Sequence, residues 1–475
     1  MTIDLDASLN DIGYAKVLVA LKPQMALAQP AAAEAELDAH FVVPDQTQVA
    51  RLAAVADRAA SRKFKRPEAL TQRRVRVYPH LGLALGYVDR RGSASLAADN
   101  RVDTVVPAPE MRLIRPVSVH APSRVTADPT WGLTRLKVPQ LWAAGFTGEG
   151  VLVGHLDTGI DGRHPALRDA IDEFAEFDWA GERVPGAKPW DSDQVTPAHG
   201  THTAGTIAGR PTTKRNVGVA PGAKLASGLV IEGGQVIDRV LAGMEWVLSK
   251  GARILSMSLG LPGYTTAFQV LTNAVRNQNV LPVMAVGNEG PNTSRSPGNY
   301  DNVLGVGAMN RQNIVADFSG SQKFQRANDP LVPDLVAPGV DVISCAPNNG
   351  YAEMNGSSMA TPHVAGVAAL LLQAKPTATA SELEQAILSS CRLPSSMLKE
   401  RGNRGVPDAV AAFTTLTGHP PVRMVRRAVP KPPQRRRKLA RGTKAAARAR
   451  PASPGRRSKR RSKRRAATAR PRRTR

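Results

Sequence analysis

One segment of the sequence, residues 359–373, is a predicted helix that is apolar on nearly every side. Its large apolar residues recur at helical spacing: Val364, Val367, Leu370 and Leu371. Pro362 places the helix start near Ser358, because proline is accepted only in the first turn. A helix without a polar face must be covered on all sides, so the segment predicts a layered fold with a large core.

The region from residue 150 to 375 alternates between strand and helix patterns. Short apolar runs, such as VLVGHL (151–156) and VLPVMAV (280–286), are typical of strands buried on both faces. This alternation predicts an α/β fold: a mostly parallel sheet with helices on both faces. A polar residue stands at the end or start of three of these elements: Asp157, His199 and Asn288.

Two adjacent serines, Ser357 and Ser358, precede the apolar helix. A serine at this place is a favoured helix cap and needs no further role. A serine hydroxyl is a useful nucleophile only with a base, a group that orients the base, and donors for an oxyanion. His199, Asp157 and Asn288 are candidates for these three roles.

The residues around these positions resemble a known family. DTGID, HGTH, GNEG and GSSMATPHVAG, in that order, are similar to the four signature segments of the subtilisin-like serine peptidases. The segments VGVAPGA (217–223) and LVAPG (335–339) also match, and the similarity runs from about Trp131 to about Ala412. The resemblance implies a subtilisin-like peptidase domain over residues 131–416.

The resemblance also implies the role of each candidate residue. The family nucleophile follows a Gly-Thr pair, so Ser357 stands in the threonine place and Ser358 is the expected nucleophile. His199 would be the general base, oriented by Asp157. Asn288 and the Ser358 backbone N–H would stabilise the oxyanion. The expected reaction is the hydrolysis of peptide bonds in proteins or peptides through an acyl-enzyme.

Four other histidines are not expected to be catalytic: His155, His164, His202 and His363. His202 faces away from the site that His199 faces and is predicted to be structural, and His164 and His363 resemble family positions that flank motif prolines and glycines. His155 alternates with Asp157 on one strand face, which favours packing near the site. The HGTH segment places its histidines three positions apart and lacks the glutamate of a zinc-binding helix, so no zinc site is predicted there.

The segment SMSLGLPG (256–263) resembles the family strand that pairs with an extended substrate. It makes Ser258, Leu259 and Gly260 candidate substrate-binding residues. Glu289 and Arg295, which follow Asn288, are expected in the second wall of the primary substrate pocket. The hypothesis is that Arg295 narrows this pocket or favours an acidic side chain, unless Glu289 neutralises it.

No cofactor is expected for catalysis. Family members often bind calcium in an asparagine-rich loop after the histidine helix. Here the loop is GRPTTKRNVG (209–218), with Lys214 and Arg215 and a single asparagine. Calcium prefers clustered oxygen ligands, so the sequence does not favour calcium there.

The N-terminal region predicts a separate unit over residues 14–116, after an arm of residues 1–13. A strand is expected over 14–22, a helix over 47–60, a hairpin over 74–88 and an extended piece over 101–116. This order suits a small α+β, ferredoxin-like domain.

This unit is weakly similar to the propeptide domains that precede subtilisin-like catalytic domains. As a propeptide it would assist folding and inhibit the site until it is cut away. The cut is expected between about Pro116 and Trp131, in the linker 117–130. A permanent accessory domain is the alternative.

The net charge of +25 is concentrated at the C-terminus. Residues 421–475 hold 24 of the 64 Lys and Arg residues and no acidic one, which leaves 40 basic and 39 acidic side chains elsewhere. The whole tail, 417–475, has few large apolar residues and is expected to be disordered. Its basic part would bind polyanions by releasing counterions. Nucleic acid is the favoured partner, and an anionic membrane surface or an acidic protein is the alternative partner. A solubilising tail without a fixed partner is the alternative.

No spanning helix and no basic signal peptide are recognised, so a cytoplasmic protein is favoured and a secreted one is the alternative. Cys345 and Cys391 do not form a disulfide framework. Two rival functions stay open: a polyanion-associated binding protein with a retired peptidase domain, and a processing peptidase held by its tail that cuts one partner.

Overall fold

A computed structural model describes residues 5–11, 13–22, 30–44, 74–122, 126–193, 198–213, 215–231, 236–326 and 328–422. The helix expected over 47–60 and the basic tail from residue 423 onward lie outside the described residues.

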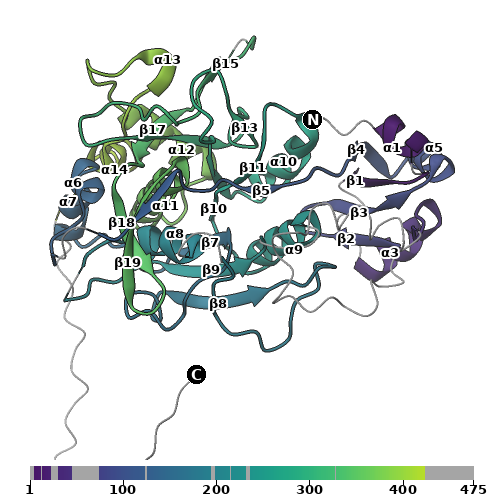
Figure 1. Cartoon of the computed structure of the whole chain (residues 1–475), viewed down its shortest axis with the longest axis horizontal. Helices are drawn as coiled ribbons and strands as arrows, with labels where there is room; N and C mark the ends of the chain where they lie inside the picture. Colours follow the sequence, from purple (N-terminus) through teal and green to yellow (C-terminus); the bar gives the residue numbers. More distant parts are fainter. Residues whose placement is uncertain are drawn as a thin grey trace, which may run out of the picture. The chain divides into compact units, whose positions relative to one another are not determined.

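The region that follows the linker is built on a seven-stranded sheet, ordered β17-β14-β12-β10-β7-β9-β8 (Figure 1). All neighbouring strands run parallel, so the predicted parallel sheet is confirmed. The strands are β7 (Leu152–Asp157), β8 (Ile171–Glu176), β9 (Lys224–Leu229), β10 (Ile254–Met257), β12 (Leu281–Ala285), β14 (Leu304–Met309) and β17 (Leu335–Pro338).

Helices cover both faces of this sheet, as the alternation predicts. Val153 and Ile254 pack into the cluster that contains α8 (His199–Ala208) and α11 (Ser357–Ala374). Leu156 and Leu255, further along the same two strands, pack on the other face with α9 (Val236–Ser249) and α10 (Gln269–Asn277). The remaining helical segments of this region are α6 (Trp131–Arg135), α7 (Val138–Ala143), η2 (Thr266–Phe268), α12 (Ala380–Ser390), α13 (Lys399–Gly402) and α14 (Ala409–Thr417).

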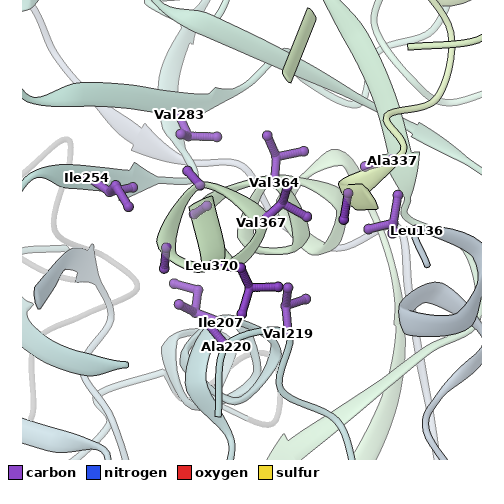
Figure 2. Close-up of a cluster of buried hydrophobic side chains, with 14 of the residues drawn as sticks. Leu136, Ile207, Val219, Ala220, Ile254, Val283, Ala337, Val364, Val367 and Leu370 are labelled. Atoms are coloured by element: carbon purple, nitrogen blue, oxygen red, sulfur yellow. The ribbon is translucent and has the colours of Figure 1, made fainter. Parts of the chain in front are cut away.

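Helix α11 is the apolar segment singled out in the sequence, and it lies in the core. Every residue from Ser357 to Leu372 is buried. Figure 2 shows Val364, Val367 and Leu370 of α11 surrounded by side chains of the sheet and of α8. The helix starts at Ser357, next to the predicted start near Ser358, but Pro362 is its sixth residue and lies inside the helix, beyond the first turn in which it was expected. The helix thus fixes its first residues, the two serines, against the end of the sheet.

Short strands surround the main sheet. They are β11 (Leu259–Pro262), β13 (Arg295–Ser296), β15 (Gln322–Lys323), β16 (Leu331–Val332), β18 (Val342–Ala346) and β19 (Gly350–Asn355). Strand β11 pairs with β13, and β19 pairs with β18. Both β11 and β19 also pair with strands from before residue 121, which bear on the site described below.

The N-terminal unit is an antiparallel sheet in the order β2-β3-β1-β4. Its elements are α1 (Leu5–Asp11), β1 (Ala15–Leu21), α3 (Pro30–Leu37), η1 (Asp38–His40), β2 (Val75–Tyr78), β3 (Leu83–Val88), α5 (Arg90–Ala98) and β4 (Val102–Pro107). The expected strand over 14–22 and the expected hairpin over 74–88 are therefore present. The expected extended piece over 101–116 is divided into β4 and the two-residue strand β5 (Arg112–Leu113).

One face of the N-terminal sheet has its own core, and the other face packs on α9. Leu18, Tyr78 and Leu83 belong to the apolar cluster that contains Val240 and Met244 of α9. A carboxylate adds polar contacts here, because Glu245 of α9 accepts hydrogen bonds from the N–H groups of His80 and Leu81, at 3.1 and 3.2 Å.

Candidate active site

The four candidate residues lie at one edge of the parallel sheet. Asp157 is the last residue of β7, and Asn288 follows β12. His199 and Ser358 lie in the first turns of α8 and α11. Because the carboxyl ends of parallel strands share an edge, the sheet brings these polar groups together.

Asp157 and His199 form a direct, buried pair. His199 Nδ1 lies 2.7 Å from Asp157 Oδ1, and the two side chains are 0% and 2% exposed. The Thr158 N–H also donates to Asp157 Oδ1, at 2.7 Å, and the Thr203 hydroxyl donates to Oδ2, at 3.2 Å. These bonds hold the carboxylate in place, so the imidazole is oriented with Nε2 turned away from Asp157.

The pair shifts the pKa of both groups. Burial opposes the charged form of each, but the opposite charge and the shared hydrogen bond outweigh it. The pKa of His199 is therefore raised above its ordinary value, and the pKa of Asp157 is lowered. An imidazole with these properties takes up a proton readily near neutral pH.

The Ser358 hydroxyl is directed at a backbone carbonyl of the chain itself. Ser358 Oγ donates to the carbonyl oxygen of Ile114, at 2.6 Å. His199 Nε2 is buried and has no hydrogen-bond partner among the described residues. The hydroxyl therefore bonds to the peptide segment and not to the imidazole.

The buried Ser357 and the partly buried Asn288 form a second arrangement beside the first. The backbone N–H and the hydroxyl of Ser357 both donate to Asn288 Oδ1, at 2.8 Å each. The Asn288 amide is thereby fixed with Nδ2 turned outward, and Nδ2 donates to the carbonyl oxygen of Arg115, at 2.9 Å. Ser357, the serine that is not the expected nucleophile, therefore orients the side-chain amide of Asn288.

The segment that crosses the site, residues 112–117, is called the strap here. Its strand β5 pairs antiparallel with β11, with Leu113 opposite Leu259 and Arg112 opposite Gly260. The Ile114 N–H donates to the carbonyl oxygen of Ser258, at 3.0 Å. The strap thus adds a strand to β11 and bonds to Ser258 just before it, so it pairs with the three residues that were proposed to bind substrate.

Beyond Ser358 the chain pairs with a different strand. The Val117 N–H donates to the carbonyl oxygen of Asn355, at 2.7 Å. Strand β6 (Ser118–His120) then pairs antiparallel with β19. The carbonyl groups that Ser358 and Asn288 contact belong to Ile114 and Arg115. Both residues lie before the linker 117–130, in which the cut was expected and which includes the paired strand β6.

Glu289 and Arg295 form an ion pair with each other. Arg295 Nη2 lies 2.5 Å from Glu289 Oε1, and Arg295 Nε donates to the same oxygen at 2.9 Å. Arg295 also belongs to β13, next to β11. The condition attached to the pocket hypothesis, neutralisation of Arg295 by Glu289, is therefore met in the structure.

The other histidines bond within the protein, as expected for structural residues. His202 Nε2 lies 3.0 Å from the Val342 carbonyl oxygen, and His363 Nδ1 lies 2.8 Å from that of Met359. His164 Nε2 lies 2.9 Å from the carbonyl oxygen of Gly350. His155 bonds to the hydroxyls of Ser227 and Thr203, and burial lowers its pKa to about 4.

The loop after α8 supplies few ligands for calcium. Arg210 donates to two carbonyl oxygens, of Ala208 and Asp169, and the Arg215 guanidinium lies against the ring of Tyr351. The described part of the chain contains no group of three or more His, Cys, Asp or Glu side chains that could hold a metal ion. Among the same residues, no helix is long and apolar enough to cross a membrane.

Several groups at the site were not singled out in the sequence. Ser357 was noted only for its place in the motif, although a hydroxyl in the family's threonine place was a usable signal. Thr203 is one of three threonines in a helix of small residues, and Asp193 is an acid before His199. No local pattern distinguishes either residue. Arg115 becomes relevant only through the tertiary pairing of the strap.

Comparisons with known proteins agree with this arrangement. The model of the subtilase family matches residues 148–414. Subtilisin BL of Lederbergia lenta is 39% identical over 249 residues, which cover 52% of this chain and 85% of that protein.

Two further relatives are similar. M-protease of Shouchella clausii (strain KSM-K16) is 39% identical over 52% of this chain, and subtilisin E of Bacillus subtilis (strain 168) is 36% identical over 55% of it. The chain spans 60% and 65% of these two proteins, less than two thirds of each. The family match covers more than half of the chain and includes all four candidate residues. The chain belongs to the subtilase family and is a subtilisin-like serine peptidase.

Proposed function

We propose that the chain hydrolyses peptide bonds within proteins through Asp157, His199 and Ser358, with Asn288 as oxyanion donor. One observation carries the proposal. A peptide segment lies in strand pairing with β11, and a carbonyl of this segment accepts the Ser358 hydroxyl at 2.6 Å. The oriented His199–Asp157 pair and the Asn288 amide lie around the same segment.

The reaction uses these groups in turn. Ser358 Oγ attacks the carbonyl carbon while His199 Nε2 takes its proton, and Asp157 stabilises the imidazolium that forms. The carbonyl oxygen becomes an oxyanion, stabilised by Asn288 Nδ2 and the Ser358 N–H. His199 then gives the proton to the leaving amine, and the C–N bond breaks. A water molecule, deprotonated by His199, releases the acyl group from Ser358 in the reverse sequence.

We further propose that the N-terminal unit is a propeptide that the enzyme removes itself. The strap pairs with β11 and contacts Ser358, so a substrate protein cannot pair with β11 until the strap leaves, and the N-terminal sheet that precedes the strap packs on α9. The Ser358 hydroxyl contacts the Ile114 carbonyl, whereas Asn288 contacts the Arg115 carbonyl. Nucleophile and oxyanion donor act on one carbonyl during catalysis, so the strap has to shift locally before it is cut.

The test compares the purified full chain with its Ser358→Ala variant during incubation. Intact mass and N-terminal sequence report cleavage, and casein hydrolysis reports activity on other proteins. We expect only the chain with Ser358 to lose about its first 115 residues and then to hydrolyse casein. Casein hydrolysis without this loss would support the peptidase and contradict the propeptide. If the chain with Ser358 cleaved neither itself nor casein, the alternative function would be favoured, a polyanion-binding protein whose peptidase domain is inactive.

A second proposal concerns residues 421–475, which hold 24 basic and no acidic residues. We propose that they bind polyanions, nucleic acid first, as an accessory to the peptidase. Binding should weaken steeply with salt and depend little on base sequence. Titration of double-stranded DNA with the full chain and with a chain ending at residue 422, at several salt concentrations, tests this. Equal affinities of the two chains would leave the tail without this role.

A further inference from the structure

The strap places an arginine directly after the carbonyl that Ser358 contacts. The Ile114 N–H continues the pairing of β5 with β11, and the Ile114 carbonyl accepts the Ser358 hydroxyl. Of the bonds in the strap, the one between Ile114 and Arg115 is therefore nearest to the nucleophile. Arg115 is the first residue on the far side of that bond.

The side chain of Arg115 reaches an acid of the peptidase region. Arg115 Nη1 lies 3.6 Å from Asp193 Oδ1, an ion pair longer than a hydrogen bond. The Asp193 side chain is 0% exposed, whereas that of Arg115 is 38% exposed. With the strap in place, the buried Asp193 carboxylate is thus paired with the guanidinium of Arg115 in the strap.

Asp193 is fixed relative to the catalytic histidine. Its Oδ2 accepts the backbone N–H of His199, at 3.2 Å, and its own N–H donates to Asp191 Oδ1, at 3.1 Å. The Asp193 carboxylate is therefore held close to His199, the proposed base. The residue that follows the cut bond would lie in the same place, within reach of this carboxylate.

The neighbouring acid, Asp191, is engaged within the protein. It accepts the hydroxyls of Thr158 and Thr201 and the N–H of Thr201, at 2.6 to 2.8 Å. Burial raises the pKa of Asp191 to about 6, although these hydrogen bonds oppose the shift. Asp191 thus supports the loop, and Asp193 is the acid that interacts with the strap.

We propose that Asp193 is a specificity-determining residue that selects arginine or lysine immediately after the bond that is cut. The inference rests on the proposed function and deepens it, because it assigns a substrate class to the same groove. A buried carboxylate is costly to leave without a cation, so a neutral residue at this position forfeits an interaction that a basic residue makes. The backbone of Arg115 is held at the same time by Asn288 Nδ2, which fixes where its side chain begins.

The test uses two fluorogenic peptides of the sequence 110–120, EMRLIRPVSVH, one with Arg115 and one with citrulline there. Citrulline has nearly the shape of arginine without its charge, and both peptides keep Arg112. The full chain, incubated until it hydrolyses casein, is the enzyme, and mass spectrometry of the products locates the cut. We expect cleavage before residue 115 and a kcat/KM about tenfold higher for the arginine peptide, the change worth about 1.4 kcal/mol.

The variant Asp193→Asn should reduce this arginine-to-citrulline ratio toward one, because its amide keeps an oxygen for the His199 N–H but has no charge. Glu289→Gln is the matched control. It also removes a carboxylate beside the site, but that carboxylate pairs with Arg295 and not with Arg115, so the ratio should persist. The ratio should also fall as salt rises, since Arg115 is partly exposed.

The outcomes separate the two proposals. Casein hydrolysis with equal rates on the two peptides, or with cleavage after the arginine, would overturn the role of Asp193 and leave the peptidase intact. A chain that hydrolyses neither casein nor peptides would contradict the proposed function itself. Should Asp193→Asn fail to fold, the peptide comparison on the unmodified chain still decides the question.

Discussion

The adjacent serines of the active site have different neighbours and therefore different proposed tasks. Ser358 directs its hydroxyl at the strap, whereas Ser357 gives its hydroxyl and its N–H to Asn288 Oδ1. An amide held by two donors on its oxygen cannot turn over without breaking both, so Nδ2 stays directed into the groove. Preorganisation of this kind is what makes an oxyanion donor effective.

Removal of the Ser357 hydroxyl should therefore weaken catalysis without abolishing it. In Ser357→Ala the backbone N–H still holds Asn288, so we expect kcat to fall by about tenfold. Loss of the whole amide in Asn288→Ala should cost about 10²–10³ in kcat, the magnitude known for the corresponding donor in a subtilisin. Steady-state kinetics measures both, and Ser357→Thr, which keeps a hydroxyl, is the control. A loss in Ser357→Ala equal to that in Asn288→Ala would mean that the hydroxyl has a further role.

The pair of Asp157 and His199 predicts the pH dependence of activity. The base works in its neutral form, and Asp157 raises the pKa of His199 above its ordinary value near 6.5. Activity should therefore be lost as pH falls through this raised pKa, so the acidic limb of kcat/KM lies above pH 6.5.

Asp157→Asn removes the charge that raises the pKa of His199, so the limb should move to lower pH while the maximal rate falls. The pH profiles of the two enzymes on one peptide measure this. Glu173→Gln, at a surface ion pair with Lys250, is the control and should leave the limb in place. An unchanged limb in Asp157→Asn would show that another group sets it.

Among the elements, helix α11 connects the core to the site most directly. Its residues from Ser357 to Leu372 are all buried, so its N-terminal turn cannot move without disturbing packing on every side. The helix also packs closely against Val219, because a Cβ atom added at Gly366 would lie 2.5 Å from Val219 Cβ. The positions of both serines are thus consequences of the packing of the whole helix.

Truncation inside α11 should destabilise this region strongly. Leu370 is 0% exposed in the core shown in Figure 2, and Leu370→Ala should cost about 2–5 kcal/mol because it leaves a cavity. Leu398→Ala, at a leucine that is 69% exposed, should change stability by at most about 0.5 kcal/mol. Urea unfolding of both variants, each combined with Ser358→Ala to prevent self-digestion, gives the comparison. Similar midpoints for the two would contradict the central place of α11.

The elements also show why the sequence predicted some features and missed others. The strand pattern, the apolar α11 and the order of motifs are local signals, so the parallel sheet and the four candidate residues followed from them. The expected hairpin over 74–88 was equally local. The pairing of β5 with β11 joins residues about 146 apart and is carried by backbone atoms, which leave no side-chain pattern.

The partners of single polar residues could not be predicted from local patterns either, because those partners lie far away in the sequence. Arg115 meets Asp193, and Ser357 meets Asn288, only because separate elements fold against each other. The position of the strap depends on pairing with β11 before the site and with β19 after it. The cut was expected in the Pro-, Ala- and Ser-rich linker after Pro116, whereas the carbonyl that Ser358 contacts is that of Ile114.

For the molecule as a whole, the N-terminal sheet and the strap form one inhibitory surface in our proposal. The sheet packs on α9 through apolar side chains, and Glu245 accepts two backbone N–H groups of the β2–β3 turn. Lys16 of β1 pairs with Asp238 at the other end of α9. The strap occupies the groove in continuation of this sheet. After a cut in the strap, the contacts with α9 would remain, and they would determine how long the fragment stays bound.

Glu245 should therefore control the delay between cleavage and activity. In Glu245→Ala, the N–H groups of His80 and Leu81 lose a charged acceptor, and hydrogen bonds to charged groups contribute about 1.5–3 kcal/mol. Dissociation of the fragment should accelerate by about tenfold or more, so casein hydrolysis should begin sooner after the cut that mass spectrometry detects.

Glu173→Ala is the matched control, since it breaks an ion pair with Lys250 that involves no residue of the N-terminal sheet. It should leave the delay unchanged. If Glu245→Ala showed the same delay as the unmodified chain, the contact with α9 would not hold the fragment. The strap alone would then account for inhibition, and the N-terminal sheet would serve folding or an accessory function.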